Sequence, residues 1–352
     1  MFYCAGGILV VLLLSAASYT LKPPSASGRL LIWKVGIQMV CDKPFTGFGK
    51  GGFAANYLYY QAEYLKASAS PEEKRLAGSN HLAFNEPLRV AVEHGMMGLI
   101  IYLAFVALIL LPGKNDHAVS MISKSLLAGI VAWGLFDNVT HTFPVLVLGV
   151  MGVACSLGRC GKIRLSMSGK MFSKAWIAVV CCLVVAAGGM LCAKWKSYHG
   201  LQSYLNHCEV KDRYRLSDAL DTFTKGLESD INFSFFYCRV LKEAHRDSAF
   251  LHSLHFLENH FPTSGLFVMK GDYWRERGQW AEAERAYRLA ADMMPSLQVP
   301  RARLALLYKE TGREKEALDI VRRILAEEVK VYGFDTYTLH RDLKRIFEDE
   351  LK

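Results

Sequence analysis

Five apolar runs, each near the length of a membrane span, constrain the fold of this chain more than any other feature. A transmembrane helix needs about 20 consecutive, mostly apolar residues. We therefore predict an all-α fold in which residues 1–193 form a polytopic membrane domain of about five spans. The runs are Phe2–Ser18, Val90–Leu111, Val119–Phe136, Phe143–Leu157 and Trp176–Cys192.

Two details of these runs affect the topology. The third and fourth runs are short for a bilayer and flank the polar stretch Asp137–His141, which predicts a pair of spans joined by a tight turn. No basic segment precedes Phe2–Ser18, so we interpret this run as a span. A signal peptide cleaved near Ala16–Ser18 is the alternative.

Loop charges predict the orientation. The segment Gly158–Lys174 contains five basic residues and no acidic residue. Segments of this kind remain on the cytoplasmic side of a membrane. Counting spans from this segment places the large loop 19–89, and everything after Cys192, on the outer side.

Composition argues against two other classes of protein. The chain has 42 Lys and Arg against 33 Asp and Glu, which gives a net charge of +9. These basic residues are dispersed rather than gathered on one face, so we expect no nucleic-acid partner. None of the nine cysteines forms a CxxC pair, and those inside apolar runs behave as small hydrophobic groups. We expect no metal site and no cofactor.

After about Tyr198 the composition becomes that of a soluble helical domain, and we predict a repeat domain of helix pairs over residues 198–352. The spacing resembles that of tetratricopeptide repeats (TPR), which have a period of about 34 residues. One copy is Gly271, Trp274, Gly278, Ala283, Tyr287, Ala290 and Pro295, and the next is Ala305, Tyr308, Gly312 and Ala317. Weaker copies lie at Asp218–Leu227 and before Pro262, and Thr338–Leu351 is expected to cap the stack. Such domains bind proteins or peptides, so we predict a protein partner here.

The stretch Pro44–Gly98 is where we expect chemistry, because a long loop between spans is uncommon unless it is functional. Gly47–Gly52 satisfies G-x-G-x-x-G, but no strand precedes it, so we expect no dinucleotide site. The glycines predict a mobile or tightly turned segment at the membrane surface. Its free backbone amides suit a phosphate group, and Lys50 adds a cation.

Arg29 and Trp33 lie where the first span emerges, and two roles are open for them. One role is an interfacial anchor, with the indole at headgroup depth. In the other, the planar guanidinium of Arg29 binds an anionic head group, because its geometry matches phosphate oxygens.

Residues 85–87 (Asn-Glu-Pro) predict a helix start with Asn85 as the N-cap. Arg89 and Glu93 follow four residues apart on one face of an otherwise apolar helix. Charged groups entering a membrane helix face each other or a cavity. The pair is therefore either a mutual salt bridge or a polar wall of a substrate cleft.

His81 precedes this helix and has a side chain suited to proton transfer near neutral pH. Asp137 and His141, in the other outer turn, are further candidates for the same surface. Below them, Gly95 and Gly98 permit close helix packing.

In their order and spacing these features resemble the O-antigen ligase family, which includes O-antigen ligases, O-antigen polymerases and bacterial protein O-oligosaccharyltransferases. The likeness covers about residues 25–157, and a trailing TPR domain is found in some members. The matching elements are Ser27-Gly28-Arg29 with Trp33, Pro44-Phe45-x-Gly47-x-Gly49, Asn85 with Leu88, and Glu93-x-Gly95-x-x-Gly98.

The resemblance implies a membrane glycan transferase that needs neither metal nor nucleotide. It moves a glycan from a polyprenyl-diphosphate carrier to an acceptor on the periplasmic face of the bacterial inner membrane. It also implies that Arg29 holds the diphosphate and that a loop histidine assists the acceptor. We predict catalytic roles for His81 and Glu93, and contacts to the diphosphate or glycan from Arg29, Lys50, Asn85 and Arg89.

Two departures from the family pattern keep other interpretations open. Phe84 stands where many members have a histidine, and His81 is the nearest histidine. Members also have more spans, so Met1 is expected to lie partway through the usual membrane domain. The alternatives are a non-catalytic, membrane-anchored TPR scaffold, or one part of a split transferase.

Overall fold

The computed structural model describes residues 23–111, 118–157, 185, 188–189, 191–204, 213–227, 230–329 and 333–351. Every regular element in these ranges is a helix, as the all-α prediction requires. The predicted span Phe2–Ser18 lies outside the described residues, and most of Trp176–Cys192 does too. The total number of spans therefore stays a prediction.

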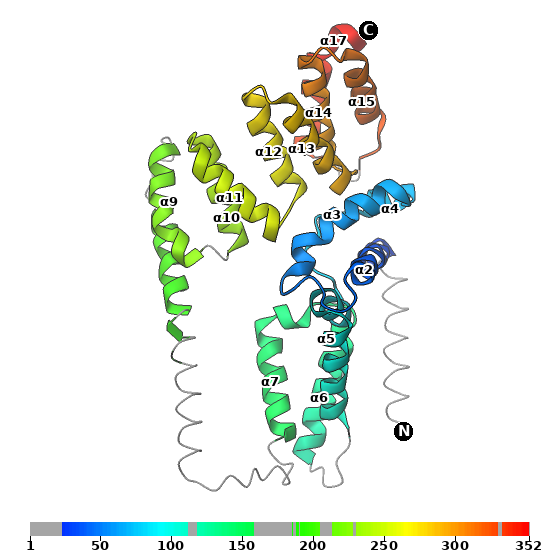
Figure 1. Cartoon of the computed structure of the whole chain (residues 1–352), viewed down its shortest axis with the longest axis vertical. Coiled ribbons are helices and arrows are strands. Elements are labelled where there is room, and N and C mark those ends of the chain that lie inside the picture. Colours follow the sequence, from blue (N-terminus) through cyan, green and yellow to red (C-terminus); the bar gives the residue numbers. More distant parts are fainter. Residues whose placement is uncertain are drawn as a thin grey trace. The chain divides into compact units, whose positions relative to one another are not determined.

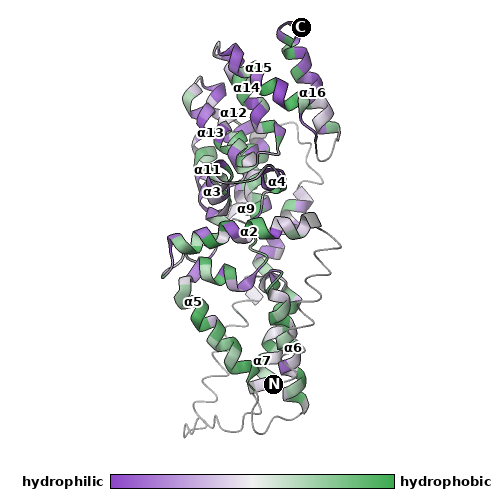
Figure 2. Ribbon diagram, turned by 90° about the vertical axis from the view of Figure 1, so that its right-hand side faces the viewer, coloured by the Kyte–Doolittle hydropathy of each residue, from purple (hydrophilic) through white to green (hydrophobic). Residues whose placement is uncertain are grey.

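Three apolar helices correspond to the central runs: α5 (Glu86–Leu110), α6 (Ala118–Gly134) and α7 (Phe143–Leu157). They lie side by side (Figure 1). Only α5, among the described helices, is long and apolar enough to cross a membrane, and the apolar parts of α6 and α7 are shorter. Large apolar side chains on all three are exposed, including Ile101, Ile122 and Val150, and the three helices are mostly hydrophobic in Figure 2. Such a surface suits lipid rather than water.

The predicted large loop 19–89 is not an irregular loop over its described residues. It folds into α2 (Pro23–Asp42), α3 (Gly52–Ala67) and the short α4 (Pro71–Leu76). The physical reason is a helical spacing of apolar residues that the overall polarity of the segment hides. Leu31, Val35 and Met39, four residues apart, are all buried on one face of α2.

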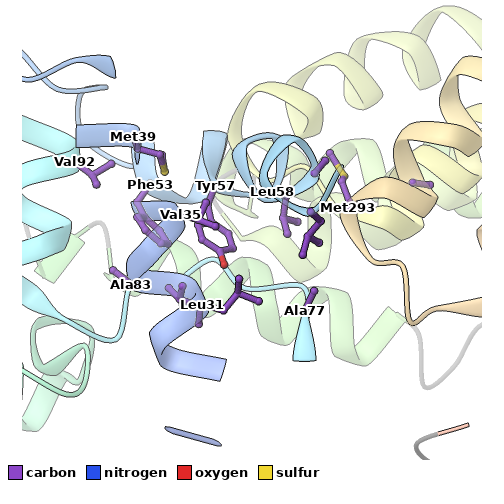
Figure 3. Close-up of a cluster of buried hydrophobic side chains, with 14 of the residues drawn as sticks. Leu31, Val35, Met39, Phe53, Tyr57, Leu58, Ala77, Ala83, Val92 and Met293 are labelled. Atoms are coloured by element: carbon purple, nitrogen blue, oxygen red, sulfur yellow. The ribbon is translucent and has the colours of Figure 1, made fainter. Parts of the chain in front are cut away.

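The core of this region joins segments far apart in the sequence. Apolar side chains of α2 and α3 and of the first turns of α5 pack together with residues of two later helices, α12 (Ser264–Glu276) and α13 (Trp280–Met293). Figure 3 shows Tyr57 and Leu58 of α3 in the same cluster as Met293. All three side chains are fully buried. The segment predicted as a loop is thus an integral part of a folded core.

The C-terminal helices form successive pairs, as the repeat pattern predicts. In the first pair, α12 and α13, Gly271 faces the ring of Tyr287 with no room for a Cβ atom. The second pair is α14 (Gln298–Glu310) and α15 (Glu314–Ala326), followed by α16 (Phe334–Ile346) and α17 (Glu348–Leu351). The assignment of these pairs to the TPR class stays a prediction.

The chain divides into two compact units, and the domain boundary between residues 193 and 198 stays a prediction. One unit combines Met1–Arg159 with Glu258–Lys352, and the other is Cys160–Leu257. The second unit contains α9 (Arg213–Leu227), α10 (Ile231–Glu243) and the first part of α11 (Asp247–His260). The helices from α12 onward belong to the first unit because α3 buries its apolar face on α13.

Candidate functional site

The glycine-rich loop between α2 and α3 is hydrogen-bonded to the backbone of α5. The amide of Phe48 donates to the carbonyl of Val92 at 2.9 Å, and the amide of Gly49 donates to the carbonyl of Glu93 at 2.8 Å. These carbonyls lack their usual helical partners because α5 has non-helical torsion angles at Gly95. The loop therefore replaces part of the helical hydrogen bonding of α5. Of the two sequence interpretations, mobile or tightly turned, the structure has the tight turn.

Two glycines make this contact possible. Gly95 has φ +67°, and a Cβ atom there would overlap the carbonyl of Phe45. Gly47 has φ +65°, and a Cβ atom there would lie 2.5 Å from the carbonyl of Glu93. Gly95 was predicted to permit helix packing, but what it admits is the loop. Only glycine adopts this conformation freely and leaves this space.

A buried ionic network lies at the start of α5, one turn from this contact. Glu86 is only 2% exposed, and its Oε2 accepts hydrogen bonds from Arg89 Nε at 2.9 Å and Nη2 at 2.7 Å. Its Oε1 accepts from the backbone amide of Thr140 at 3.0 Å and the hydroxyl of the same residue at 2.6 Å. Arg89 Nη1 also donates to Glu93 Oε2 at 3.1 Å. Glu93 Oε1 accepts from the amide of Gly51 at 3.1 Å, which ties the loop to the network.

The network includes a salt bridge between Arg89 and Glu93, which is one of the two interpretations of this pair, and it adds Glu86, which sequence reasoning missed. With Glu86 included, two carboxylates surround one guanidinium, so the charge of Arg89 is compensated within the protein. Such a group attracts a diphosphate far less than a guanidinium without a carboxylate partner does. The signal for Glu86 was its spacing, three residues before Arg89 on the same helix.

Glu86→Ala is expected to lower the free energy of unfolding by about 1–3 kcal/mol, because the amide of Thr140 and two N–H donors of Arg89 lose their buried acceptor. The ion pair between Arg89 and Glu93 remains. Glu86→Gln should cost less, since an amide oxygen still accepts from Thr140. Chemical denaturation of the purified protein in detergent measures the effect, with the exposed Glu72 of α4 changed to Ala as the matched control. Equal stability of the Glu86→Ala and Glu72→Ala variants would show that the network contributes nothing.

Asn85 is the N-cap of α5, as predicted. Its Oδ1 accepts from the amide of Leu88 at 2.8 Å, and its Nδ2 donates to the carbonyl of Leu135 at 3.0 Å. The second bond joins the start of α5 to the end of α6. Through it, and through Thr140, the turn between α6 and α7 approaches the same surface. Asp137 and His141 belong to this turn, and His141 is exposed.

Arg29 lies beside the segment that leads into α5. Its guanidinium carbon is 5.4 Å from the centroid of the Phe84 ring, a cation–π arrangement. One helical turn later, Trp33 Nε1 donates to the carbonyl of Ala83 at 3.1 Å. Among the described residues Arg29 has no ion-pair partner, in contrast to Arg89. Phe84 has φ +49°, a left-handed conformation that is uncommon for a bulky non-glycine residue and stores backbone strain.

Lys50 is exposed and lies in the loop between Gly49 and Gly51, both bonded to Glu93. The structure thus brings Lys50, Asn85, Arg89 and Glu93 onto one backbone assembly. Arg29 joins this assembly through Phe84, the neighbour of Asn85.

His81 has different surroundings. Its ring lies edge-on to Phe261 at 5.9 Å, and its Nδ1 is buried without a hydrogen-bond partner in the described part of the chain. Burial lowers the pKa of His81, and a hydrogen bond with the backbone of Ala54 opposes this shift. The neutral imidazole therefore persists to lower pH than in an exposed histidine, as a proton acceptor requires.

If His81 accepts a proton in the reaction, the acidic limb of the pH–rate profile is expected below 6.5, the ordinary value for histidine. The sign follows from the lowered pKa, because activity is lost only where the imidazole becomes protonated. Phe261→Ala exposes the ring and should move this limb upward, toward 6.5. Transfer rates measured across pH test both shifts. If Phe261→Ala leaves the pH of the acidic limb unchanged, His81 is not the proton acceptor.

Residues 2–103 match the family model of the O-antigen ligase domain. The match includes α2, α3, α4 and the part of α5 that carries the ionic network and Gly95. It supports an O-antigen ligase-type glycan transferase of polysaccharide or lipopolysaccharide biosynthesis. No curated protein matches the chain.

Proposed function

We propose that this protein transfers a glycan from a polyprenyl-diphosphate carrier to an acceptor at the outer face of a bacterial inner membrane. The observation that carries the proposal is the docking of the Pro44–Gly51 loop on α5. It unites the glycine motifs of the O-antigen ligase region into one backbone assembly. Hydrogen bonds and glycines of this kind preorganise a site on rigid elements.

Arg29 and Lys50 are the proposed contacts to the diphosphate. Neither has an acidic partner among the described residues, so each retains a charge for an anionic ligand. Negative charge develops on the leaving diphosphate, and a fixed cation stabilises it most in the transition state. A guanidinium suits this task because its donors match phosphate oxygens.

The remaining predicted residues receive supporting roles or a role in proton transfer. Asn85 caps α5, and Arg89 and Glu93 hold the loop against it. Glu93 is thus proposed to position Lys50 rather than to react. His81 is the proposed proton acceptor for the hydroxyl of the acceptor.

The orientation follows from the charge of Gly158–Lys174, whose cytoplasmic placement puts the starts of α5 and α7 on the outer side. The lipid carrier would then meet the site at the membrane surface. The protein is accordingly proposed to be a multi-pass protein of the inner membrane.

A separable scaffold is the competing function, and the packing of α3 argues against it. The amide of Gln61 is buried and donates to the carbonyl of Met293 at 2.7 Å. Lys66 forms an ion pair with Asp292 at 2.6 Å. A separable scaffold requires the helix pair α12 and α13 to be independent of the membrane domain. This pair instead packs in the same hydrophobic core as α2, α3 and α5, which carry the candidate site.

The test is a transfer assay in membranes that contain the full chain, a polyprenyl-diphosphate glycan and candidate acceptors of three kinds: lipid A core, polysaccharide and protein. Transfer to one acceptor, lost on replacing His81 by Ala, supports the proposal. Absence of transfer to all three, with a C-terminal segment 198–352 that captures a partner by itself, would favour the scaffold.

A further inference from the structure

A groove of about 590 Å³ lies between α2 and α3, and none of its lining residues belongs to the ionic network. Its volume is in the range of small-molecule and ligand sites. The groove begins next to the motif loop, because Asp42, the last residue of α2, immediately precedes that loop. Its walls are Ile37, Gln38, Cys41 and Asp42 from α2, and Tyr59, Tyr60 and Glu63 from α3.

Two aromatic rings in the groove are held in place by hydrogen bonds of their hydroxyl groups. Tyr60 donates to the carboxylate of Asp42, and its ring lies nearly perpendicular to the ring of Phe48, with the centroids 5.7 Å apart. Tyr59 donates to the backbone carbonyl of Glu258 at 3.2 Å. Rings fixed in this way offer flat apolar faces with little loss of conformational entropy on binding.

The polar groups of the groove are carboxylates and an amide. Glu63 and Gln38 are exposed and have no partner among the described residues. These groups pair well with hydroxyl groups, since a carboxylate accepts several hydrogen bonds and an amide both donates and accepts. No Lys or Arg is among the lining residues. Two carboxylates repel a diphosphate, so the charged end of a donor is excluded.

We propose that this groove binds the saccharide part of a glycan, of a neutral or amino-sugar type. The assignment of that saccharide to a transfer substrate rests on the proposed function above. Pyranose rings present C–H groups to aromatic faces and hydroxyl groups to carboxylates, and the groove offers both surfaces side by side. The two ends of the donor would thus bind at different places: the diphosphate at the cations Arg29 and Lys50, and the saccharide in the groove. The fixed rings favour a saccharide over a basic peptide, which two carboxylates alone would also attract.

Binding can be measured without catalysis, using the full chain in lipid nanodiscs on an array of neutral, amino-sugar and acidic oligosaccharides, with oligolysine as a further probe. Neutral or amino-sugar oligosaccharides are expected to bind, and acidic ones are not. Glu63→Lys should weaken the binding of the captured oligosaccharide by about tenfold, whereas Glu63→Gln should weaken it less. Glu63 is exposed on α3, so neither change disturbs the core.

The matched control is Glu72→Lys, which makes the same charge change on α4, outside the groove. Equal effects of Glu63→Lys and Glu72→Lys would overturn the proposal, as would binding of oligolysine with no oligosaccharide. If Glu63→Lys weakens oligosaccharide binding but the membranes show no transfer, saccharide binding by the groove is supported and the proposed transferase function is refuted. If transfer occurs but Glu63→Lys does not change oligosaccharide binding, saccharide binding by the groove is refuted and the proposed transferase function is supported.

Discussion

Gly95→Ala is expected to detach the motif loop from α5 and to lower the free energy of unfolding by about 3 kcal/mol or more. Gly95 has φ +67°, and a Cβ atom there would overlap the carbonyl of Phe45 and lie 2.9 Å from that of Pro44. The amide of Met96, which donates to Pro44 at 2.7 Å, would lose this bond when the loop moves. Both the backbone strain and the displaced loop lower the free energy of unfolding.

The effect is measured by thermal unfolding in detergent and by the rate of proteolysis within residues 44–51. Gly129→Ala in α6 is the matched control, because nothing lies within 4 Å of a Cβ atom built there. The control should unfold at the temperature of the parent protein, since alanine favours a helix. If Gly95→Ala also behaves like the parent, the docking of the loop on α5 is not a property of the folded protein.

Arg29→Ala is expected to reduce glycan transfer by about 10²–10³-fold, the usual effect of removing one group that stabilises developing negative charge. The physical reason is that Arg29 has no described carboxylate partner and lies over Phe84 at 5.4 Å, beside the start of α5. Arg29→Lys should restore only part of the rate, because an ammonium cannot form the bidentate pair with phosphate oxygens. The fold should change little.

Initial rates of transfer in membranes, at equal amounts of protein, measure this loss. Arg75→Ala is the control, since Arg75 is an exposed basic residue of α4 with no role in the proposed site. Transfer by Arg29→Ala at the parental rate would refute the diphosphate role. The remaining interpretation of Arg29 would then be the interfacial anchor.

Local patterns in the sequence predicted several elements correctly. The apolar runs gave α5, α6 and α7, and Asn85 caps α5 as its residue type requires. The small and aromatic residues at Gly271 and Tyr287 meet as the repeat spacing predicts. These features depend on residues close together in the chain, where hydrogen bonding and side-chain period are fixed by the helix itself.

Long-range contacts account for what the sequence missed. The apolar residues of α2 and α3 lie in a segment that is polar overall, and they are buried against each other and against α5, α12 and α13. The contact with α13 joins residues 232 positions apart, as between Gln61 and Met293. The role of Glu86 was also missed, because its hydrogen bond with Thr140 joins residues that are far apart in the sequence.

By itself, the sequence determined the helical class, the apolar runs and the motifs that lie in the O-antigen ligase region. Only the tertiary structure decided that Arg89 is neutralised by two carboxylates while Arg29 is not. It also decided that Gly95 admits a loop rather than another helix. The physical reason is that charge compensation and the space around a backbone atom depend on which distant segments pack together, and no local pattern encodes that choice.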